Sequence, residues 1–303
     1  MTVLDFMGKR KLAAVFSSIL LVASIVSLAT QQLSLGLDFT GGTLIEVGYQ
    51  QPANLNEIRS TLKAAGYDDA VAQNYGKATD VLVRLAPQEG KKESIANNIV
   101  EELNKTSSSE VTLRRVEFVG PQVGDELRDQ SGIAMIVALG VMMVYILFRF
   151  HFKFSVGAVA ALFHDVIITL GFFSIFHIPF DLTVLAAVLA VIGYSLNDTI
   201  VVSDRIRENF HEMRKGDAVQ IINVSLSQTL GRTLITSITT LLVLVALFVF
   251  GGELIKGFSI ALMVGVLIGT YSSIYVASNI LLAMGICKED FIHVEAEVVD
   301  DRP

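Results

Sequence analysis

Three ionisable residues, Asp165, Asp198 and Arg232, lie inside stretches of sequence that are otherwise long and apolar. A charge in the hydrocarbon of a membrane is energetically costly. Chains that keep one there pair it, turn it into a helix bundle or use it to move ions. These residues therefore predict a membrane protein whose buried charges handle ions, rather than a soluble enzyme.

Asp198 and Arg232 are expected at nearly the same depth in the membrane. Asp198 lies 17 residues after Asp181, and Arg232 lies 19 residues before Gly251. If Asp181 and Gly251 mark the same membrane boundary, two antiparallel helices allow the carboxylate and the guanidinium to pair. Two hypotheses follow. The pair is either a static contact that fixes helix register or a proton carrier that alternates between paired and unpaired states, and we favour the carrier.

Other polar residues surround these charges. Asn197 adjoins Asp198, and Thr236 lies on a hydroxyl-rich helix face with Arg232. We assign both, together with Asp165, to the same proton pathway, although such hydroxyls also serve as ordinary hydrogen bonds between helices. Asp165 is expected nearer the membrane midplane, and its neighbour His164 is expected to point about 100° away around the helix.

Other chemistries lack the residues that they need. The sequence has 5 His and 1 Cys, scattered along the chain, so neither a metal site nor a disulfide is expected. It contains no G-x-x-x-x-G-K-[ST] loop, so we expect no ATP hydrolysis and no enzyme activity. The net charge of −7 and the absence of a basic face argue against a nucleic-acid partner. No cofactor is expected, and protons are the expected coupling ion.

The apolar residues occur in runs, as a polytopic α-helical membrane protein requires. Of the 303 residues, 52% are hydrophobic and 17% are charged, and a membrane-spanning helix needs about 20 mostly apolar residues. Six segments qualify: Leu12–Ala29, Ile133–Phe148, Phe154–Phe176, Leu182–Val202, Thr233–Phe250 and Gly257–Met284. The first run is longer than the apolar region of a typical signal peptide, so we expect an uncleaved anchor.

The short loops predict the orientation, because Lys and Arg gather on the cytoplasmic side. The basic residues of these loops are Lys9, Arg10, Lys11, Arg149, Lys153, Arg205, Arg207, Arg214 and Lys215. Both termini are therefore expected in the cytoplasm, with residues 1–30 forming the N-terminus and first span. Residues 31–130 are then expected outside the cytoplasm, and residues 131–287 hold the other five spans.

Residues 31–130 are expected to form a small α+β domain with the β-α-β-β-α-β order of ferredoxin-like folds. Asn54 with Glu57 three residues later predicts a helix start, and Gly66 predicts the end of that helix. The expected strands are Thr43–Val47, Ala70–Tyr75, Asp80–Leu85 and Val111–Val119, and the second helix is Lys92–Asn104.

Three further segments carry structural expectations. Residues 204–226 mix charges with spaced apolar residues, which fits either an amphipathic helix on the cytoplasmic surface or an extension of the fourth span. Residues 288–303 form an acidic tail. Gly41 and Gly42 permit a tight turn where the chain leaves the membrane, and Asp38 is expected to bond the backbone of that turn.

Several motifs occur in one order along the chain. They are Leu35–Gly42 (LGLDFTGG), Val119–Gly124 (VGPQVG), Phe163–Val166 (FHDV), Gly193–Thr199 (GYSLNDT), Asp204–Asn209 (DRIREN) and Gln228–Leu234 (QTLGRTL). Together they resemble the SecF proteins of the bacterial SecD/SecF protein-export family, in the resistance-nodulation-division superfamily. The resemblance covers nearly the whole chain.

The resemblance implies a subunit of the Sec preprotein translocase that couples the proton-motive force to late steps of export across the bacterial inner membrane. It implies SecD, the SecYEG channel, YajC and YidC as partners, and a translocating polypeptide as the substrate. It places Asp198 and Arg232 in the proton pathway and gives Asp165 no defined role. Two alternatives remain at this point: a proton-coupled small-molecule transporter of the same superfamily, and a non-catalytic scaffold of the export channel.

Overall fold

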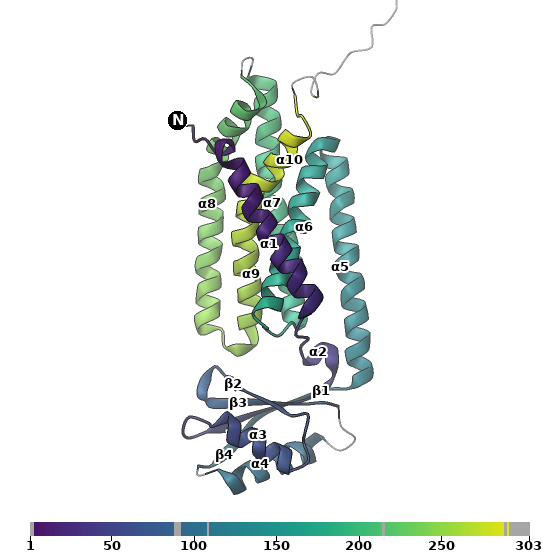
Figure 1. Ribbon diagram of the computed structural model, residues 1–303, viewed down its shortest axis with the longest axis vertical. Helices are drawn as coiled ribbons and strands as arrows, with labels where there is room; N and C mark the ends of the chain where they lie inside the picture. The colour runs from purple at the N-terminus through teal and green to yellow at the C-terminus, as the bar shows by residue number, and fades with distance from the viewer. Residues whose placement is uncertain (1–2, 88–91, 108, 214–215, 288–289, 291–303) are drawn as a thin grey trace, which may run out of the picture.

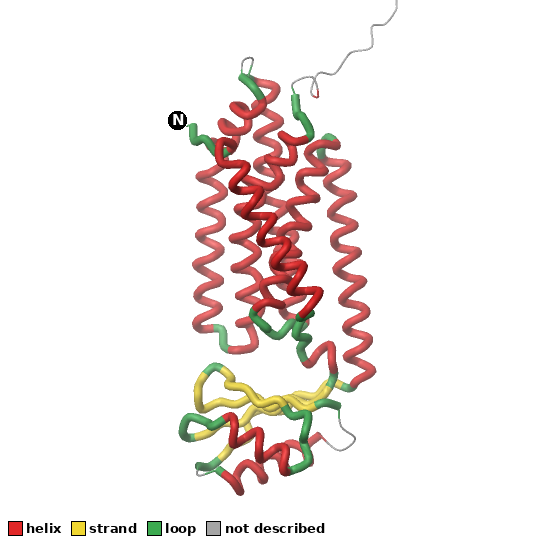
Figure 2. Tube along the Cα trace, viewed as in Figure 1, coloured by secondary structure: helices red, strands yellow, loops and turns green. Residues whose placement is uncertain are grey.

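The molecule consists of a bundle of long helices with a small domain at one end (Figure 1). The computed structural model describes residues 3–87, 92–107, 109–213, 216–287 and 290. The acidic tail expected at residues 288–303 therefore lies outside the described residues, apart from Asp290. Figure 2 shows the helical bundle, the sheet and the helices of the small domain as three successive layers.

The bundle contains six helical spans that are long and apolar enough to cross a membrane within the part of the chain described. They are α1 (Arg10–Thr30), α5 (Pro121–Arg149), α6 (Phe152–Ile175), α7 (Leu182–Glu212), α8 (Ala218–Phe250) and a composite sixth span. The sixth span consists of α9 (Glu253–Ser272), the π-helical segment η2 (Ser273–Ala277) and α10 (Ser278–Ala283). A short 3₁₀ turn, η1 (Met7–Lys9), precedes α1. The six predicted spans are all present.

Several helices extend beyond the apolar runs that predicted them. Helix α5 begins at Pro121, so the end of the small domain, expected near residue 130, lies at Gly120. Helix α7 continues to Glu212, which is the helical extension of the fourth span rather than a separate surface helix. Helix α8 then begins after Asp217, whose side chain accepts a hydrogen bond from the Gln220 amide at 2.9 Å.

The centre of the bundle is formed by α6, α7 and the sixth span, which are the most buried of the membrane helices. Small residues allow α9 to approach α7 closely, as in other membrane helix pairs. A Cβ atom added at Gly265 would lie 2.1 Å from Val191 Cγ2, and one added at Gly269 would lie 3.1 Å from Ser195 Cβ. Helices α1, α5 and α8 surround this centre and expose many apolar side chains.

The small domain follows the predicted element order. Its strands β1 (Gly42–Tyr49), β2 (Val71–Tyr75), β3 (Lys77–Leu85) and β4 (Val111–Val119) form one antiparallel sheet in the order β2-β3-β1-β4. Helices α3 (Leu55–Ala64) and α4 (Lys92–Thr106) cover the face turned away from the bundle (Figure 2). The core between them buries Ile45, Val83, Leu62 and Ile99 completely.

A short connection fastens the domain to the bundle. It contains the one-turn helix α2 (Leu37–Thr40) and a parallel bridge between Leu35 and Phe180, in the loop that joins α6 to α7. Arg84 of β3 donates to the Leu35 carbonyl at 3.0 Å and also to the Thr40 hydroxyl. The sheet is thus joined to the membrane helices near α2 and the start of α5.

Candidate functional site

Asp198 lies in α7 near the middle of the bundle and is only 8% exposed. Its two carboxylate oxygens accept hydrogen bonds from hydroxyls on neighbouring spans. Thr233 of α8 donates to Oδ1 at 2.6 Å, and Ser273 of the sixth span donates to Oδ2 at 2.5 Å. The carboxylate therefore joins three spans through neutral donors.

Arg232 does not pair with Asp198 in this structure. Among the described residues no ion pair joins the two side chains, and the Arg232 residue is exposed on the outer face of α8. The direct pair expected from their common depth is therefore wrong for this conformation. The reason is helical geometry: Thr233 turns toward α7, so Arg232, one residue earlier, points about 100° away from it.

Two other predicted pathway residues are exposed, as Arg232 is. Asn197 of α7 and Thr236 of α8 are exposed, and the Thr236 hydroxyl donates to the Arg232 backbone carbonyl at 3.0 Å. The predicted pathway residues are thus divided into two groups. Asp198 and Asp165 are buried, whereas Arg232, Asn197 and Thr236 are exposed on α7 and α8, and these three are hereafter called the exposed α7–α8 polar residues.

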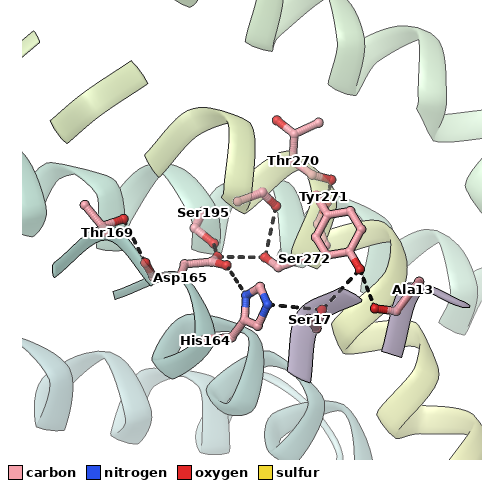
Figure 3. A network of polar contacts seen from close by, with 11 residues as sticks. Ala13, Ser17, His164, Asp165, Thr169, Ser195, Thr270, Tyr271 and Ser272 are labelled. Atoms are coloured by element: carbon pink, nitrogen blue, oxygen red, sulfur yellow. Dashed lines mark hydrogen bonds and ion pairs between the residues drawn. The ribbon is translucent and has the colours of Figure 1, made fainter. Parts of the chain in front are cut away.

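Asp165 of α6 is fully buried and forms the centre of a second polar network (Figure 3). Ser195 of α7 donates to its Oδ2 at 2.5 Å, and Ser272 of α9 donates to the same oxygen at 2.7 Å. His164 Nδ1 lies 2.9 Å from Oδ1. Adjacent residues on a helix do not usually face each other, and we expected His164 to point away, so that expectation is wrong.

The imidazole of His164 extends the network to α1. Its Nε2 lies 3.2 Å from the Ser17 hydroxyl, which lies 3.1 Å from the Tyr271 hydroxyl. Tyr271 in turn donates to the Ala13 carbonyl at 2.7 Å. Four spans, α1, α6, α7 and α9, therefore meet at one carboxylate (Figure 3).

The sequence did not indicate most of these partners. Ser17, Ser195, Ser272 and Ser273 lie within otherwise apolar runs, where serine usually packs between helices. One signal was present: Ser272 and Ser273 follow each other in a span with small residues at every fourth position. What the spacing did not show is the π-helical segment that starts at Ser273.

The LGLDFTGG motif has a structural role that differs in part from the expected one. Asp38 Oδ2 accepts from the Leu182 amide at 3.0 Å, so it caps the start of α7 and not its own turn. Gly41 and Gly42 have φ of 65° and 123°, which glycine adopts readily. A Cβ added at Gly42 would lie 2.2 Å from the Leu85 carbonyl oxygen.

Two acids and several hydroxyls lie within the otherwise apolar interior of this bundle. The described residues contain no group of three or more His, Cys, Asp or Glu that could hold a metal ion. Carboxylates with several hydroxyl donors can bind and release protons while the helices around them change position. The structure is therefore that of a multi-pass membrane protein with ionisable groups buried in its core.

Comparisons with known proteins identify the family. Residues 99–286 match the family described as protein export membrane protein SecD/SecF, C-terminal, and residues 26–53 match the SecD/SecF GG motif. The SecF protein translocase subunit of Pseudomonas aeruginosa is 53% identical over 99% of this chain and 98% of its own length. That of Vibrio alginolyticus is 52% identical over 97% of this chain and 94% of its own length. The chain belongs to the SecD/SecF family, within its SecF branch of protein translocase subunits.

Solved structures agree with this assignment. The crystal structure of SecDF from Thermus thermophilus, described as a translocon-associated membrane protein, superposes with a TM-score of 0.84 at 35% identity. The match covers 93% of this chain and 39% of the SecDF chain. A second SecDF structure, in a super-membrane-facing form, gives a TM-score of 0.70 over 94% of this chain. The chain thus spans less than half of the SecDF polypeptide.

Proposed function

We propose that this SecF-type subunit works with SecD to couple the proton-motive force to late steps of polypeptide export. Asp198 binds and releases the transported proton, and Arg232 stabilises its ionised form when helix movement brings the two together. Asn197 and Thr236 provide polar groups along the route. The domain of residues 42–119 transmits the movement to the emerging polypeptide.

The burial of Asp198 is the observation that carries this proposal. A carboxylate inside six membrane spans, held by two neutral hydroxyls and paired with no Lys or Arg among the described residues, is costly for a purely structural group. Its hydroxyl donors can reorient when it takes up a proton. A static ion pair, the alternative that a scaffold requires, is not formed.

The exposed α7–α8 polar residues support SecD as the partner. A guanidinium, an amide and a hydroxyl exposed in the membrane-spanning region are unfavourable against lipid. A second helical chain that offers polar groups satisfies them. The SecDF chain supports the same conclusion, because a single polypeptide there contains the equivalent of this chain plus a larger remainder. The SecYEG channel, YajC and YidC are proposed as further partners from the family resemblance.

The location is proposed from the basic loops. The chain resides in the bacterial inner membrane with both termini in the cytoplasm, and the small domain lies in the periplasm. The connection between α5 and α6, which contains the predicted basic residues Arg149 and Lys153 at its ends, lies at the end of the bundle opposite the small domain, which supports this orientation (Figure 1).

Replacement of Asp198 tests the function. Membrane vesicles that carry the assembled translocase with Asp198→Asn are expected to keep the complex but to lose the dependence of export on an imposed proton gradient. Asp204→Asn is the matched control, because Asp204 is in the same helix but is partly exposed and pairs with Arg149 at 2.9 Å. Full proton-dependent export by the Asp198→Asn complex would refute the carrier role.

A further inference from the structure

The two buried carboxylates are connected through consecutive residues of one helix. Ser272 donates to Asp165 at 2.7 Å, and Ser273 donates to Asp198 at 2.5 Å. These serines lie where α9 changes into the π-helical segment η2. Single π-helical turns within α-helices are frequent at functional sites. The same turn of the sixth span is therefore hydrogen-bonded to both acids.

We propose that His164 and Asp165 form a second proton-binding site, and that Ser272 and Ser273 couple this site to Asp198. The proposal rests on the proposed proton-driven function and extends it to groups for which the family resemblance gave no role. It makes His164 an ionisable member of the pathway and the two serines its positioning residues.

The directions of the hydrogen bonds indicate how many protons His164 and Asp165 hold together. A hydroxyl has one hydrogen to donate, and Tyr271 gives its own to the Ala13 carbonyl. Tyr271 must then accept from Ser17, so the Ser17 oxygen is left to accept from His164 Nε2. One further proton lies between Nδ1 and Asp165 Oδ1, because these atoms are 2.9 Å apart and one of them must donate.

His164 and Asp165 together consequently carry no net charge, and the proposal assigns the shared proton to Nδ1, which makes the pair an imidazolium and a carboxylate. This arrangement suits a site where the two side chains are 2% and 0% exposed. Removal of one proton leaves a buried anion. Within the described residues, no Lys or Arg lies within ion-pair distance of Asp165 to balance it. Such a state is accessible only when the surroundings change, which is the property that a gated proton site needs.

The other groups that face this pair are neutral. Tyr271 of α9 stacks on the imidazole with ring centres 6.2 Å apart, and Tyr275 of η2 lies 5.4 Å beyond Tyr271. Helix α7 contributes the Ser195 hydroxyl, and α1 contributes Ser17. The proton balance of the site therefore depends on His164 and Asp165 themselves and on nearby Asp198.

The coupling follows from a choice of acceptors available to each serine. Ser272 has the Gly269 carbonyl at 3.1 Å as its second acceptor, and Ser273 has the Thr270 carbonyl at 3.0 Å. When a carboxylate takes up a proton, its serine can turn to the backbone carbonyl. Both carbonyls belong to the last turn of α9, so protonation of either acid changes the bonding of one helical turn.

Nitrogen NMR of histidine-labelled protein in lipid bilayers, with SecD present, tests the site. We expect a His164 signal of the imidazolium type at neutral pH, assigned by its loss in His164→Gln. In Asp165→Asn the imidazolium signal should be lost, because the buried cation then has no counterion. Ser272→Ala should shift the pH at which the signal disappears by about one unit, the equivalent of one hydrogen bond to a charged group.

The control is Ser278→Ala. Ser278 is a fully buried serine of the same span, and its hydroxyl has no hydrogen-bond partner among the described residues. This variant should titrate as the original protein does. Coupling predicts that Asp198→Asn and Ser273→Ala also shift the His164 titration. A neutral His164 at all accessible pH values would overturn the site, and a titration unmoved by Asp198→Asn and Ser273→Ala would overturn the coupling.

An export assay separates this inference from the proposed function. Ser272→Ala should shift the pH profile of proton-dependent export while Ser278→Ala leaves it unchanged. If Asp198→Asn abolishes proton dependence but Ser272→Ala leaves the profile unmoved, the proposed function survives and the second site is refuted. If Asp198→Asn keeps full proton dependence, the proposed function fails, whatever the NMR result.

Discussion

Enlargement of Gly265 is expected to separate α7 from α9 and to disturb both buried acids. A Cβ atom at this position would lie 2.1 Å from Val191 Cγ2 and 2.6 Å from Cγ1. Real Cβ atoms do not approach so closely, so the helices must shift. Gly269 and Ser195, which lie one turn further along α9 and α7, then separate as well, and Ser195 is a donor to Asp165.

The size of the effect can be worked out from two opposing contributions. Insertion of a methyl group into a well-packed interior costs about 1–3 kcal/mol, whereas Gly→Ala within a helix gains about 1 kcal/mol. Gly140 of α5 provides the matched control, because an added Cβ there has no atom within 4 Å. Gly140→Ala has the same favourable change in helix propensity, so the free energy of unfolding of Gly265→Ala should be lower than that of Gly140→Ala by about 1–3 kcal/mol.

Denaturant titration in mixed detergent micelles, followed by circular dichroism, measures this difference. Val191→Ala removes both γ-carbons, so the double variant Gly265→Ala/Val191→Ala should show a favourable interaction energy of about 0.5–3 kcal/mol. Equal stability of Gly265→Ala and Gly140→Ala, or strict additivity in the double variant, would refute the close packing of α7 on α9.

Two other predictions concern the small domain and its attachment. Asp38→Ala removes the hydrogen bond to the Leu182 amide at a cost of about 0.5–2 kcal/mol. Amide hydrogen exchange at the start of α7 should therefore be faster in Asp38→Ala and nearly unchanged in Asp38→Asn. Identical exchange rates in the original protein and both variants would contradict the capping role of Asp38. Burial, followed by the charge of Glu57, raises the pKa of Tyr49 to about 12, so the stability it contributes is complete below its ordinary pKa of about 10 and is lost as pH rises toward 12. Tyr49→Phe should remove this loss of stability at alkaline pH, measured by thermal unfolding of the whole chain. It should not lower stability at neutral pH, because the Tyr49 hydroxyl has no hydrogen-bond partner among the described residues. An equal alkaline loss of stability in Tyr49→Phe would contradict the role of Tyr49.

Apolar runs predicted the membrane spans well, because hydrocarbon imposes a strict length and composition on a helix. The ends of the helices were less predictable. The polar turns that continue α7 to Glu212 and begin α5 at Pro121 lie outside any apolar run. Hydropathy cannot detect a helix that continues into water, since only the buried part must be apolar.

The sequence predicted the depth of each charged residue better than it predicted which side chain contacts that residue. Asp198 and Asp165 are both buried, as intramembrane acids usually are. The depth estimate placed Arg232 at the level of Asp198, but depth along a helix does not fix rotation around it. Thr233 occupies the inward direction that the pairing required. Only packing against α7 and the sixth span decides which of two adjacent residues faces the acid.

The two ends of the small domain lie side by side. Gly42, the first residue of β1, pairs with Val119, the last residue of β4, and a Cβ atom at Gly41 would lie 3.0 Å from Pro121 Cα. The chain thus leaves the membrane helices and returns to them at almost one point, which makes the domain a self-contained insertion. A short bridge from Gly41 to Pro121 would excise it, and another fold with adjoining ends could be grafted in its place, so that the membrane helices and the small domain can be exchanged independently.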